Sequence, residues 1–327
     1  IGTHKQEAEK METAAAVYSP SAVAVAAAPV NACELAERFF RFLDASPKTA
    51  ATYGRAVRRF LGDMSARGIA NPTRADLLQW KGDLSAQGLA PATIQLYVIA
   101  VRQLYNFAAA EYGAPNIAEH IKGAKVSKAH RKDCLSADGV RAVLGRIDRG
   151  TAKGRRLYAL CAVMVSCGLR DVEISRADVG DLRALPDGSA ALFIQGKGRT
   201  EKADFVKVPQ QAEAALRAYL ADRPDSGDAS APLFVSNSGN SAGRRLSTRS
   251  ISAAVKSALV AAGYNSPRLT AHSLRHTAVT LALLGGRSLQ EAQQFARHTN
   301  IATTQIYAHN LDAAANACGA TIAEAIF

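Results

Sequence analysis

The sequence predicts a mainly α-helical protein with a small β-sheet, built as an N-terminal helical bundle followed by an α+β domain. The 327 residues are enough for two ordinary domains, and 48% of them are apolar, which allows a sizeable core. Through the first third of the chain, apolar residues recur three or four positions apart, the period of an α-helix. Short β-rich runs occur only in the second half, so the strands are expected there.

The helical domain is expected to span residues 31–120. The residues before it, 1–30, are rich in Ala and Val and low in complexity, which predicts a disordered tail. Asn31 is a good N-cap for a first helix that runs through Phe42.

Three further helices of the bundle have recognisable ends. Ser46-Pro47 offers an N-cap followed by a proline at the first helical position, and Thr73 caps the next segment. Gly68, Gly88 and Gly113 end the three segments. The third segment carries an apolar stripe with near-ideal helical spacing, which consists of Ile94, Tyr97, Val98, Val101, Leu104, Tyr105 and Ala108.

The C-terminal domain, residues 134–327 with its terminal tail, mixes helices with a few strands. Two β-rich runs, 190–194 and 204–208, flank a Gly-Lys-Gly sequence that is typical of a hairpin tip. Residues 157–165 are densely apolar and predict a buried helix. The other elements expected from caps and periodicity are helices at 136–147, 210–221, 249–262, 272–284, 288–297 and around Tyr307, and a short strand at 233–235.

The charge of the chain favours a polyanionic partner, either nucleic acid or an anionic membrane surface. The formal net charge is +12 and the isoelectric point is about 9.7. Residues 31–132 contain 15 Lys and Arg against 8 Asp and Glu. Residues 121–133 have no regular apolar period and predict a basic interdomain linker, whose candidate DNA-binding residues are Lys122, Lys125, Lys128, Arg131 and Lys132. An ordinary solvated linker is the alternative interpretation.

Several protein classes are disfavoured by what the sequence lacks. No stretch approaches the ~20 uninterrupted apolar residues of a membrane helix. The five cysteines are scattered and form no CxxC pair, so neither a zinc site nor a disulfide framework is expected. The seven histidines also lack the spacing of zinc ligands. We therefore expect no metal and no cofactor, and a reducing cytoplasm fits the cysteine pattern best.

Cutting a DNA strand without a metal requires side chains for three tasks. Arginines suit the phosphate because they bind its oxygens bidentately and stay charged. A nucleophile must attack in line, and a general acid must protonate the leaving oxygen. In Gly168-Leu169-Arg170-Asp171-Val172-Glu173, Glu173 lies where it can orient Arg170. Taken alone, this segment is better explained by a surface ion pair.

A second group of candidates lies near the C-terminus. His272 and Arg275 are three residues apart and project from one face of a helix. His298 precedes Tyr307 by nine residues, which would place the two on opposite faces of one continuous helix. Thr299-Asn300 can instead end one helix and cap another, so that both side chains reach one site. Taken alone, a tyrosine here is better explained by packing.

The ordered set of these residues resembles the tyrosine recombinase (phage integrase) family, including the Xer-like recombinases. The resemblance covers about residues 31–320 and rests on Arg170, Lys197, His272, Arg275, His298 and Tyr307 in their order and spacing. It implies an N-terminal SAM-like core-binding bundle and a tyrosine recombinase catalytic domain that grip opposite sides of a DNA duplex.

The resemblance also implies a role for each matching residue. Tyr307 would attack the phosphate and form a 3′-phosphotyrosine with release of a 5′-hydroxyl. Lys197 would be the general acid, His272 would assist proton transfer at the tyrosine, and His298 would hydrogen-bond the phosphate. No ATP or metal is then needed, because the covalent bond conserves the energy of the phosphodiester.

The phosphate-binding roles would fall to Arg170 and Arg275, with Glu173 as a supporting residue. Arg199, on the same hairpin as Lys197, is a further candidate for contact with DNA. Lys202 also lies on this hairpin, so the assignment of the acid to Lys197 rests on the Gly-Lys-Gly match.

One segment departs from the family pattern. Many relatives carry Leu-Gly-His before the second histidine, whereas this chain has Phe295-Ala296-Arg297-His298. We interpret this as a mild exchange of Ala for Gly and expect Arg297 to add a charge near the DNA.

The sequence therefore predicts a site-specific recombinase that acts on double-stranded DNA through a Holliday junction. We expect a homotetramer on DNA, alone or with a partner recombinase, located in the cytoplasm and associated with the nucleoid. One alternative is a type IB topoisomerase-like enzyme that nicks and reseals one strand. Another is a DNA-binding protein without catalysis, which a broken catalytic set would indicate.

Overall fold

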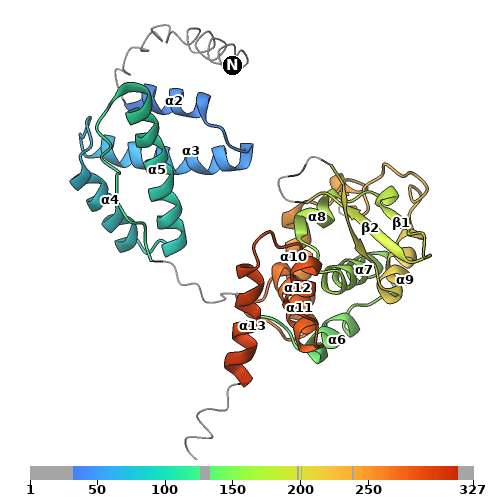
Figure 1. Cartoon of the computed structure of the whole chain (residues 1–327). Coiled ribbons are helices and arrows are strands. Elements are labelled where there is room, and N and C mark those ends of the chain that lie inside the picture. Colours follow the sequence, from blue (N-terminus) through green and yellow to red (C-terminus); the bar gives the residue numbers. More distant parts are fainter. Residues whose placement is uncertain (1–31, 126–132, 197–198, 200, 238, 316–327) are drawn as a thin grey trace, which may run out of the picture. The chain divides into compact units, whose positions relative to one another are not determined.

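The computed structural model describes residues 32–125, 133–196, 199, 201–237 and 239–315. These residues form two compact units, an all-helical unit before residue 129 and a mixed unit after it (Figure 1). Helices dominate both units and a single small sheet occurs in the second, so the predicted fold class is confirmed. The expectations for the tail 1–30, the centre of the linker and the C-terminal residues 316–327 fall outside the described residues.

The described part of the helical unit, residues 32–125, contains four helices that begin and end close to the predicted residues. They are α2 (Ala32–Phe42), α3 (Pro47–Ala66), α4 (Arg74–Ala86) and α5 (Pro91–Tyr112). The Ser46 hydroxyl accepts a hydrogen bond from the Thr49 amide, and Thr73 forms a capping box with Asp76. Gly113 follows α5 in the left-handed conformation, with φ of 64°, as its position after the helix predicts.

One of two hydrophobic clusters in the described part of the helical unit surrounds Trp80, whose side chain is fully buried. Its indole Nε1 donates a hydrogen bond of 2.8 Å to Asp63, so the single polar atom of the ring is paired. Phe60 meets the Trp80 ring edge-on, with 5.0 Å between ring centroids. Ile121 belongs to the same core, so the chain stays attached to the helical unit up to this residue.

The second unit places helices around a small antiparallel sheet. Its helices are α6 (Ala137–Gly145), α7 (Ala152–Ser166), α8 (Asp171–Arg176), α9 (Gln210–Leu220), α10 (Thr248–Ala261), α11 (Ala271–Leu284), α12 (Leu289–Ala296) and α13 (Ala302–Ala315), with 3-10 turns η1 (Val179–Asp181) and η2 (Gly239–Ser241). The densely apolar α7 packs against α9 and α11 (Figure 1). Because α11 also contacts α12 and α13, it connects this core to the C-terminal helices.

The sheet has the order β1-β2-β3, with β1 (Leu182–Ala184), β2 (Ala190–Ile194) and β3 (Asp204–Lys207). Leu192 in the central strand pairs with Leu182 on one side and Val206 on the other. The hairpin of β2 and β3 confirms the prediction, whereas β1 was not expected from the sequence. Among residues 182–184 only Leu182 is partly buried, and the other two are exposed. This edge strand therefore has no apolar run from which it could be predicted.

The predicted short strand at 233–235 is wrong. Leu233 and Phe234 are buried as their apolar character suggests, but the segment forms only isolated bridges at its ends. The Leu233 amide donates to the Ala177 carbonyl, and the Val235 amide donates to the Tyr219 hydroxyl. The Phe234 carbonyl accepts from the Leu246 amide, so these backbone groups are paired with separate partners and not along a continuous ladder.

Candidate functional site

Glu173 holds Arg170 at the start of α8. Arg170 is the N-cap of the helix, and its backbone amide donates to Glu173 Oε2 at 2.8 Å. Its Nη1 donates to Glu173 Oε1 at 2.6 Å. The Glu173 carboxylate is fully buried, whereas the Arg170 side chain keeps 24% exposure. The expected pair is therefore present, and it leaves part of the guanidinium open to a ligand.

Arg275 enters the same site from α11 and is only 1% exposed. Its Nη1 donates to the Gly168 carbonyl at 2.5 Å, and its Nη2 donates to the Ala296 carbonyl. Burial, with the nearby charges of Arg170 and Arg297, lowers the pKa of Arg275 to about 9. The guanidinium therefore remains cationic at neutral pH.

Arg297 directly follows α12, and its side chain is directed into the site. It directly precedes His298, so Arg297, and not Ala296, occupies the glycine position of Leu-Gly-His. Its side chain is 15% exposed and turns inward, where Nη2 contacts Glu173 Oε2 at 3.0 Å. The expected exchange of Ala for Gly was therefore wrong, and the added charge is paired inside the site.

Glu173 lies among these three arginines and stays ionised. Burial raises the pKa of Glu173, but Arg297, the backbone amide of Arg170 and the charges of Arg170 and Arg275 together bring it below its ordinary value. The Glu173 carboxylate is thus the counter-charge of several arginines, and the cluster keeps a net positive charge. Such an excess suits a site that receives a phosphate.

His272, His276, His298 and Tyr307 form a cluster of rings beside the arginines. The rings of His272 and His276 meet edge-on at 4.4 Å, and His276 lies 5.3 Å from Tyr307. His298 stacks at 6.2 Å from Tyr307, although nine residues separate them. The turn between α12 and α13 makes this possible, as the sequence predicted.

Tyr307 is 5% exposed, and its hydroxyl shares a hydrogen bond with His276 Nδ1. Burial raises the pKa of Tyr307 to about 12, although the charges of Arg275 and Arg170 act in the opposite direction. His298 shares a hydrogen bond of 2.9 Å with the Thr304 hydroxyl. Burial and then the charges of Arg275, Arg170 and Arg297 lower the pKa of His298 to about 4, so it is neutral at pH 7.

A cavity of about 650 Å³ brings most of these side chains together. The described residues that line it are Arg170, Glu173, Gly196, Arg199, Asp204, His272, Arg275, Arg297, His298, Thr299 and Thr303. Tyr307 is not among them; its side chain is buried, and its hydroxyl shares a hydrogen bond with His276. We call this space the arginine cavity.

The hairpin residues are only partly described. Arg199 is exposed, lines the arginine cavity and lies 3.5 Å from Asp204. Lys197 falls outside the described residues. Lys202 contacts both Asp178 and Asp181 at 2.5 Å. Burial lowers the pKa of Lys202, but the two carboxylates outweigh it and leave that pKa raised, so Lys202 is poorly suited to release a proton.

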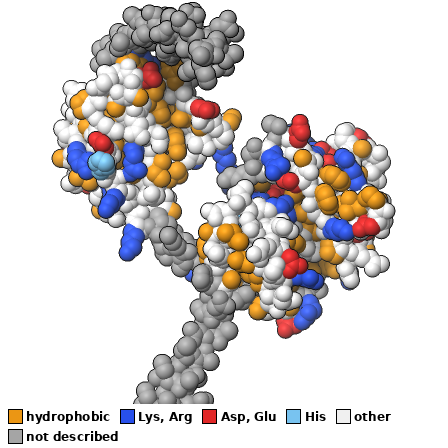
Figure 2. Space-filling view, in the orientation of Figure 1, with side chains coloured by type: hydrophobic (Ala, Val, Ile, Leu, Met, Phe, Trp, Pro, Cys, Tyr) orange, Lys and Arg blue, Asp and Glu red, His pale blue; other side chains and the backbone are white. Residues whose placement is uncertain are grey.

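The linker candidates are also only partly described. Lys122 and Lys125 are exposed, whereas Lys128, Arg131 and Lys132 lie outside the described residues. On the face drawn in Figure 2, Lys and Arg side chains gather near the lower end of the helical unit, around the histidine on that face.

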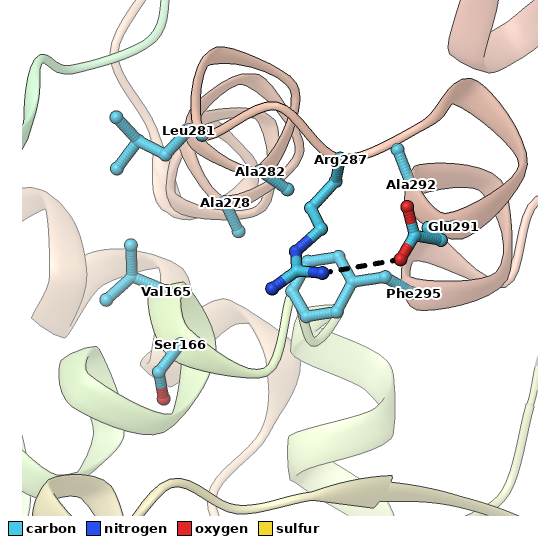
Figure 3. A pocket seen from close by; sticks show the side chains of 10 residues that line it. Val165, Ser166, Ala278, Leu281, Ala282, Arg287, Glu291, Ala292 and Phe295 are labelled. Atoms are coloured by element: carbon cyan, nitrogen blue, oxygen red, sulfur yellow. Dashed lines mark hydrogen bonds and ion pairs between the residues drawn. The ribbon is translucent and has the colours of Figure 1, made fainter.

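A second cavity, of about 520 Å³ and mostly apolar, lies between α7, α11 and α12 (Figure 3). Phe295 and Ala292 line it from α12, and Arg287 pairs with Glu291 at 3.5 Å beside it. Two residues after Phe295, Arg297 belongs to the arginine cavity instead. The end of α12 therefore separates an apolar side from a strongly charged one.

The sequence analysis missed two features of the site, the place of His276 and the inward direction of Arg297. His276 is four residues after His272, so helical spacing could have placed it on the same face. No local signal indicated that Arg297 turns inward, because its partner Glu173 is 124 residues away. Among the described residues, no group of three His, Cys, Asp or Glu could hold a metal ion, and none of the helices is long and apolar enough to cross a membrane.

Arginines and histidines that converge beside a tyrosine on a helical scaffold are the arrangement expected of an enzyme that acts on phosphodiesters. The model of the phage integrase family matches residues 134–314, and that of the phage integrase N-terminal SAM-like domain matches residues 36–112. The chain belongs to the phage integrase family and is a tyrosine recombinase, a DNA strand-exchanging enzyme.

Relatives with established names span most of the chain. The tyrosine recombinase XerD of Caulobacter vibrioides is 30% identical over 272 residues, which cover 81% of this chain and 87% of that protein. XerC of Shewanella amazonensis is 32% identical over 276 residues, with 83% and 89% covered.

Solved structures share the fold at lower sequence identity. The XerH recombinase bound to its palindromic difH substrate after cleavage has a TM-score of 0.69 and 22% identity, covering 88% of this chain and 84% of that one. A lambda integrase tetramer bound to a Holliday junction has a TM-score of 0.65 and 16% identity, covering 85% and 77%.

Proposed function

We propose that Tyr307 is the nucleophile of a DNA cleavage and rejoining reaction in the arginine cavity. The observation that carries this proposal is the convergence of Arg170, Arg275, His272 and His298 on one cavity next to the Tyr307 ring. Two cationic guanidinium groups match the non-bridging oxygens of a phosphodiester and the charge that develops there in the transition state.

In the proposed step, the Tyr307 oxygen attacks phosphorus and the bond from phosphorus to the 5′ oxygen breaks. His272 accepts or relays the tyrosine proton, and Lys197 gives a proton to the leaving 5′ oxygen. The 3′-phosphotyrosine preserves the phosphodiester energy, so the 5′-hydroxyl of another strand reverses the step without ATP. His298, neutral at pH 7, donates a hydrogen bond to the phosphate, and Glu173 supports Arg170.

We also propose the assembly in which this chemistry occurs. Two rounds of strand exchange through a Holliday junction on double-stranded DNA require four active subunits, and lambda integrase was crystallised as such a tetramer. The helical domain, residues 31–120, would bind the core site. Residues 121–133 would join it to the catalytic domain, 134–327. We place the reaction in the cytoplasm on the nucleoid, where its DNA substrate is.

A nicked suicide substrate tests the nucleophile. The wild-type chain should accumulate a covalent protein–DNA adduct that survives denaturing electrophoresis, and Tyr307→Phe should form none while it still binds DNA. Tyr158→Phe is the matched control. Tyr158 lies on α7, where the Arg149 guanidinium packs over its ring, and it does not line the arginine cavity. Adducts formed by Tyr307→Phe would show that another residue attacks.

The leaving-group proton has a test of its own. A substrate with sulfur in place of the bridging 5′ oxygen needs no acid, because a thiolate is a far better leaving group than an alkoxide. This substrate should restore cleavage by Lys197→Ala but not by Arg170→Ala. If this substrate restores cleavage by Lys202→Ala and not by Lys197→Ala, the general acid is Lys202 and not Lys197.

The same adduct would form in a topoisomerase-like enzyme, so the products decide between the two activities. Recombinant product from two marked sites supports recombination, whereas relaxation of supercoils alone supports nicking and resealing. A DNA-binding protein without catalysis would give neither.

A further inference from the structure

The turn after α12 has an unusual backbone for the residue that occupies it. Arg297 adopts φ of 53° and ψ of 46°, the left-handed conformation. A side chain with a Cβ is disfavoured there, so glycine is the residue that fits best. In the described part of the chain, the only other non-glycine residue with positive φ is His120. An arginine at this position therefore has an energetic cost that its contacts must offset.

The Arg297 side chain makes three hydrogen bonds that are all directed into the site. Its Nη1 donates to the Phe295 carbonyl at 2.9 Å, which braces the end of α12. Its Nη2 donates at 3.0 Å to both the Gly168 carbonyl and Glu173 Oε2. Arg297 thus ties the end of α12 to the turn that begins α8.

The backbone of the same turn holds the two proposed phosphate ligands. The Ala296 carbonyl accepts from Arg275 Nη2, and the Arg297 carbonyl accepts from Arg170 Nη2 at 3.4 Å. The Gly168 carbonyl is shared between Arg275 and Arg297. The direction of these carbonyls depends on the left-handed turn, so its conformation and the orientation of both arginines are coupled.

Glu173 adds an electrostatic link. Its Oε1 is bound by Arg170, while its Oε2 is bound by Arg297 and the Arg170 amide. Because the carboxylate is fully buried, it needs counter-charge from within the site. Arg297 supplies part of this counter-charge, so the Arg170 side chain does not have to supply all of it.

We propose that Arg297 is a positioning residue for DNA cleavage, which shares the charge of Glu173 and fixes the turn that aims Arg170 and Arg275 at the scissile phosphate. This inference rests on the proposed roles of Arg170 and Arg275. It assigns Arg297 an action through Glu173 and the turn, and not a direct contact with the DNA backbone.

A double-mutant cycle separates these two modes of action. Arg297→Gly, Glu173→Gln and the double variant are compared with the wild-type chain for the single-turnover rate of adduct formation at saturating DNA, and for Kd. Arg297→Gly should reduce the cleavage rate by roughly 10- to 100-fold, the size of effect that follows loss of a residue that orients a metal ligand. Its Kd and the salt dependence of Kd should stay near the wild-type values.

The coupling to Glu173 is the decisive result. In the Glu173→Gln background, Arg297→Gly should reduce the rate much less than in the wild-type background, because there is no carboxylate charge left to share. An equal fold-reduction of the cleavage rate by Arg297→Gly in both backgrounds would overturn the proposal. A weaker Kd with a shallower salt dependence and an unchanged cleavage rate would overturn it as well, in favour of a phosphate contact.

Two further variants guard against trivial explanations. Arg297→Lys keeps a positive charge beside Glu173 but not the planar fork of donors, and it should cleave at a rate between those of Arg297→Gly and wild type. A rate no better than that of Arg297→Gly would contradict the role of the charge. Arg287→Ala removes the same charge just before α12, where Arg287 pairs with Glu291 (Figure 3), and should cleave like wild type.

The outcome for Arg297 is separable from the outcome for the proposed function. If the wild-type chain forms adducts and Tyr307→Phe does not, the proposed function stands whatever Arg297 does. Thermal unfolding of Arg297→Gly supplies the remaining check, because glycine suits the backbone of this turn and the variant should remain folded. A folded variant with the wild-type rate would reject the inference alone.

Discussion

The hydroxyl of Tyr307 and the Nδ1 atom of His276 share a hydrogen bond that joins α13 to α11. Both residues are buried, at 5% and 7% exposure. The proposed nucleophile is therefore held by a histidine outside the set that sequence resemblance assigned to catalysis. The link also ties the C-terminal helix to the core of the catalytic unit.

This hydrogen bond should be measurable as a coupling between the two residues. His276→Leu should lower the free energy of unfolding by about 1–3 kcal/mol, because a buried hydroxyl loses this partner. In the Tyr307→Phe background the same change should cost less, since no hydroxyl remains to be paired. Urea unfolding of the four proteins measures the difference. The same cost in both backgrounds would mean that the bond contributes nothing to stability.

Gly168 should be intolerant of a side chain for two separate reasons. Its φ is +59°, and a Cβ would lie 2.8 Å from the Phe295 ring. Gly188 is a matched control, since its φ is +78° but a Cβ there would meet nothing within 4 Å. Both Ala variants should lose about 1–2 kcal/mol from the left-handed backbone. Gly168→Ala should lose about 1–3 kcal/mol more from the steric contact.

The same pair of variants predicts a difference in activity. The Gly168 carbonyl accepts from Arg275 and Arg297, so a shift of this turn should slow adduct formation, whereas Gly188→Ala should cleave normally. Chemical denaturation and the suicide-substrate assay supply the two measurements. Equal losses of stability in the two variants would contradict the predicted steric contact.

His298 should make the folded protein sensitive to acid. Its folded-state pKa of about 4 lies below the ordinary value of 6.5, so the unfolded chain takes up this proton first. Stability is therefore fully present above pH 6.5 and is lost as the pH falls toward 4. His298→Asn cannot take up the proton, so wild type should lose about 1–2 kcal/mol more than this variant between pH 7 and pH 4. Parallel stability curves for the two proteins would contradict the lowered pKa.

The exposed lysines at the start of the linker should contribute to DNA affinity without affecting the chemistry. Each phosphate contact contributes about 0.9 to the slope of log Kd against log salt concentration. Lys122→Ala combined with Lys125→Ala should therefore reduce this slope by about 2 and leave the cleavage rate at saturating DNA unchanged. Lys207→Ala is the control, because Lys207 is paired with Asp187 at 2.8 Å. An unchanged slope in the double variant would show that these lysines belong to an ordinary solvated linker and do not contact phosphates.

The local signals in the sequence were sufficient for most of the fold. The caps at Ser46 and Thr73, and the left-handed Gly113, lie where the sequence predicted because each depends on residues within a few positions. The expected strand at 233–235 failed for the opposite reason. Whether an apolar run forms a strand depends on a continuous partner, and here the backbone hydrogen bonds go to the separate partners Ala177, Tyr219 and Leu246.

The sequence by itself determined the family, the helical scaffold and the turn that lets His298 and Tyr307 meet. The tertiary structure decided how the site is held together: His276 bonds to the Tyr307 hydroxyl, and Arg297 turns inward to Glu173. The physical reason is separation along the chain. Helix ends and faces follow from nearby residues, whereas the direction of a long charged side chain follows from the buried carboxylate that the fold brings beside it, and for Arg297 that carboxylate lies 124 residues earlier.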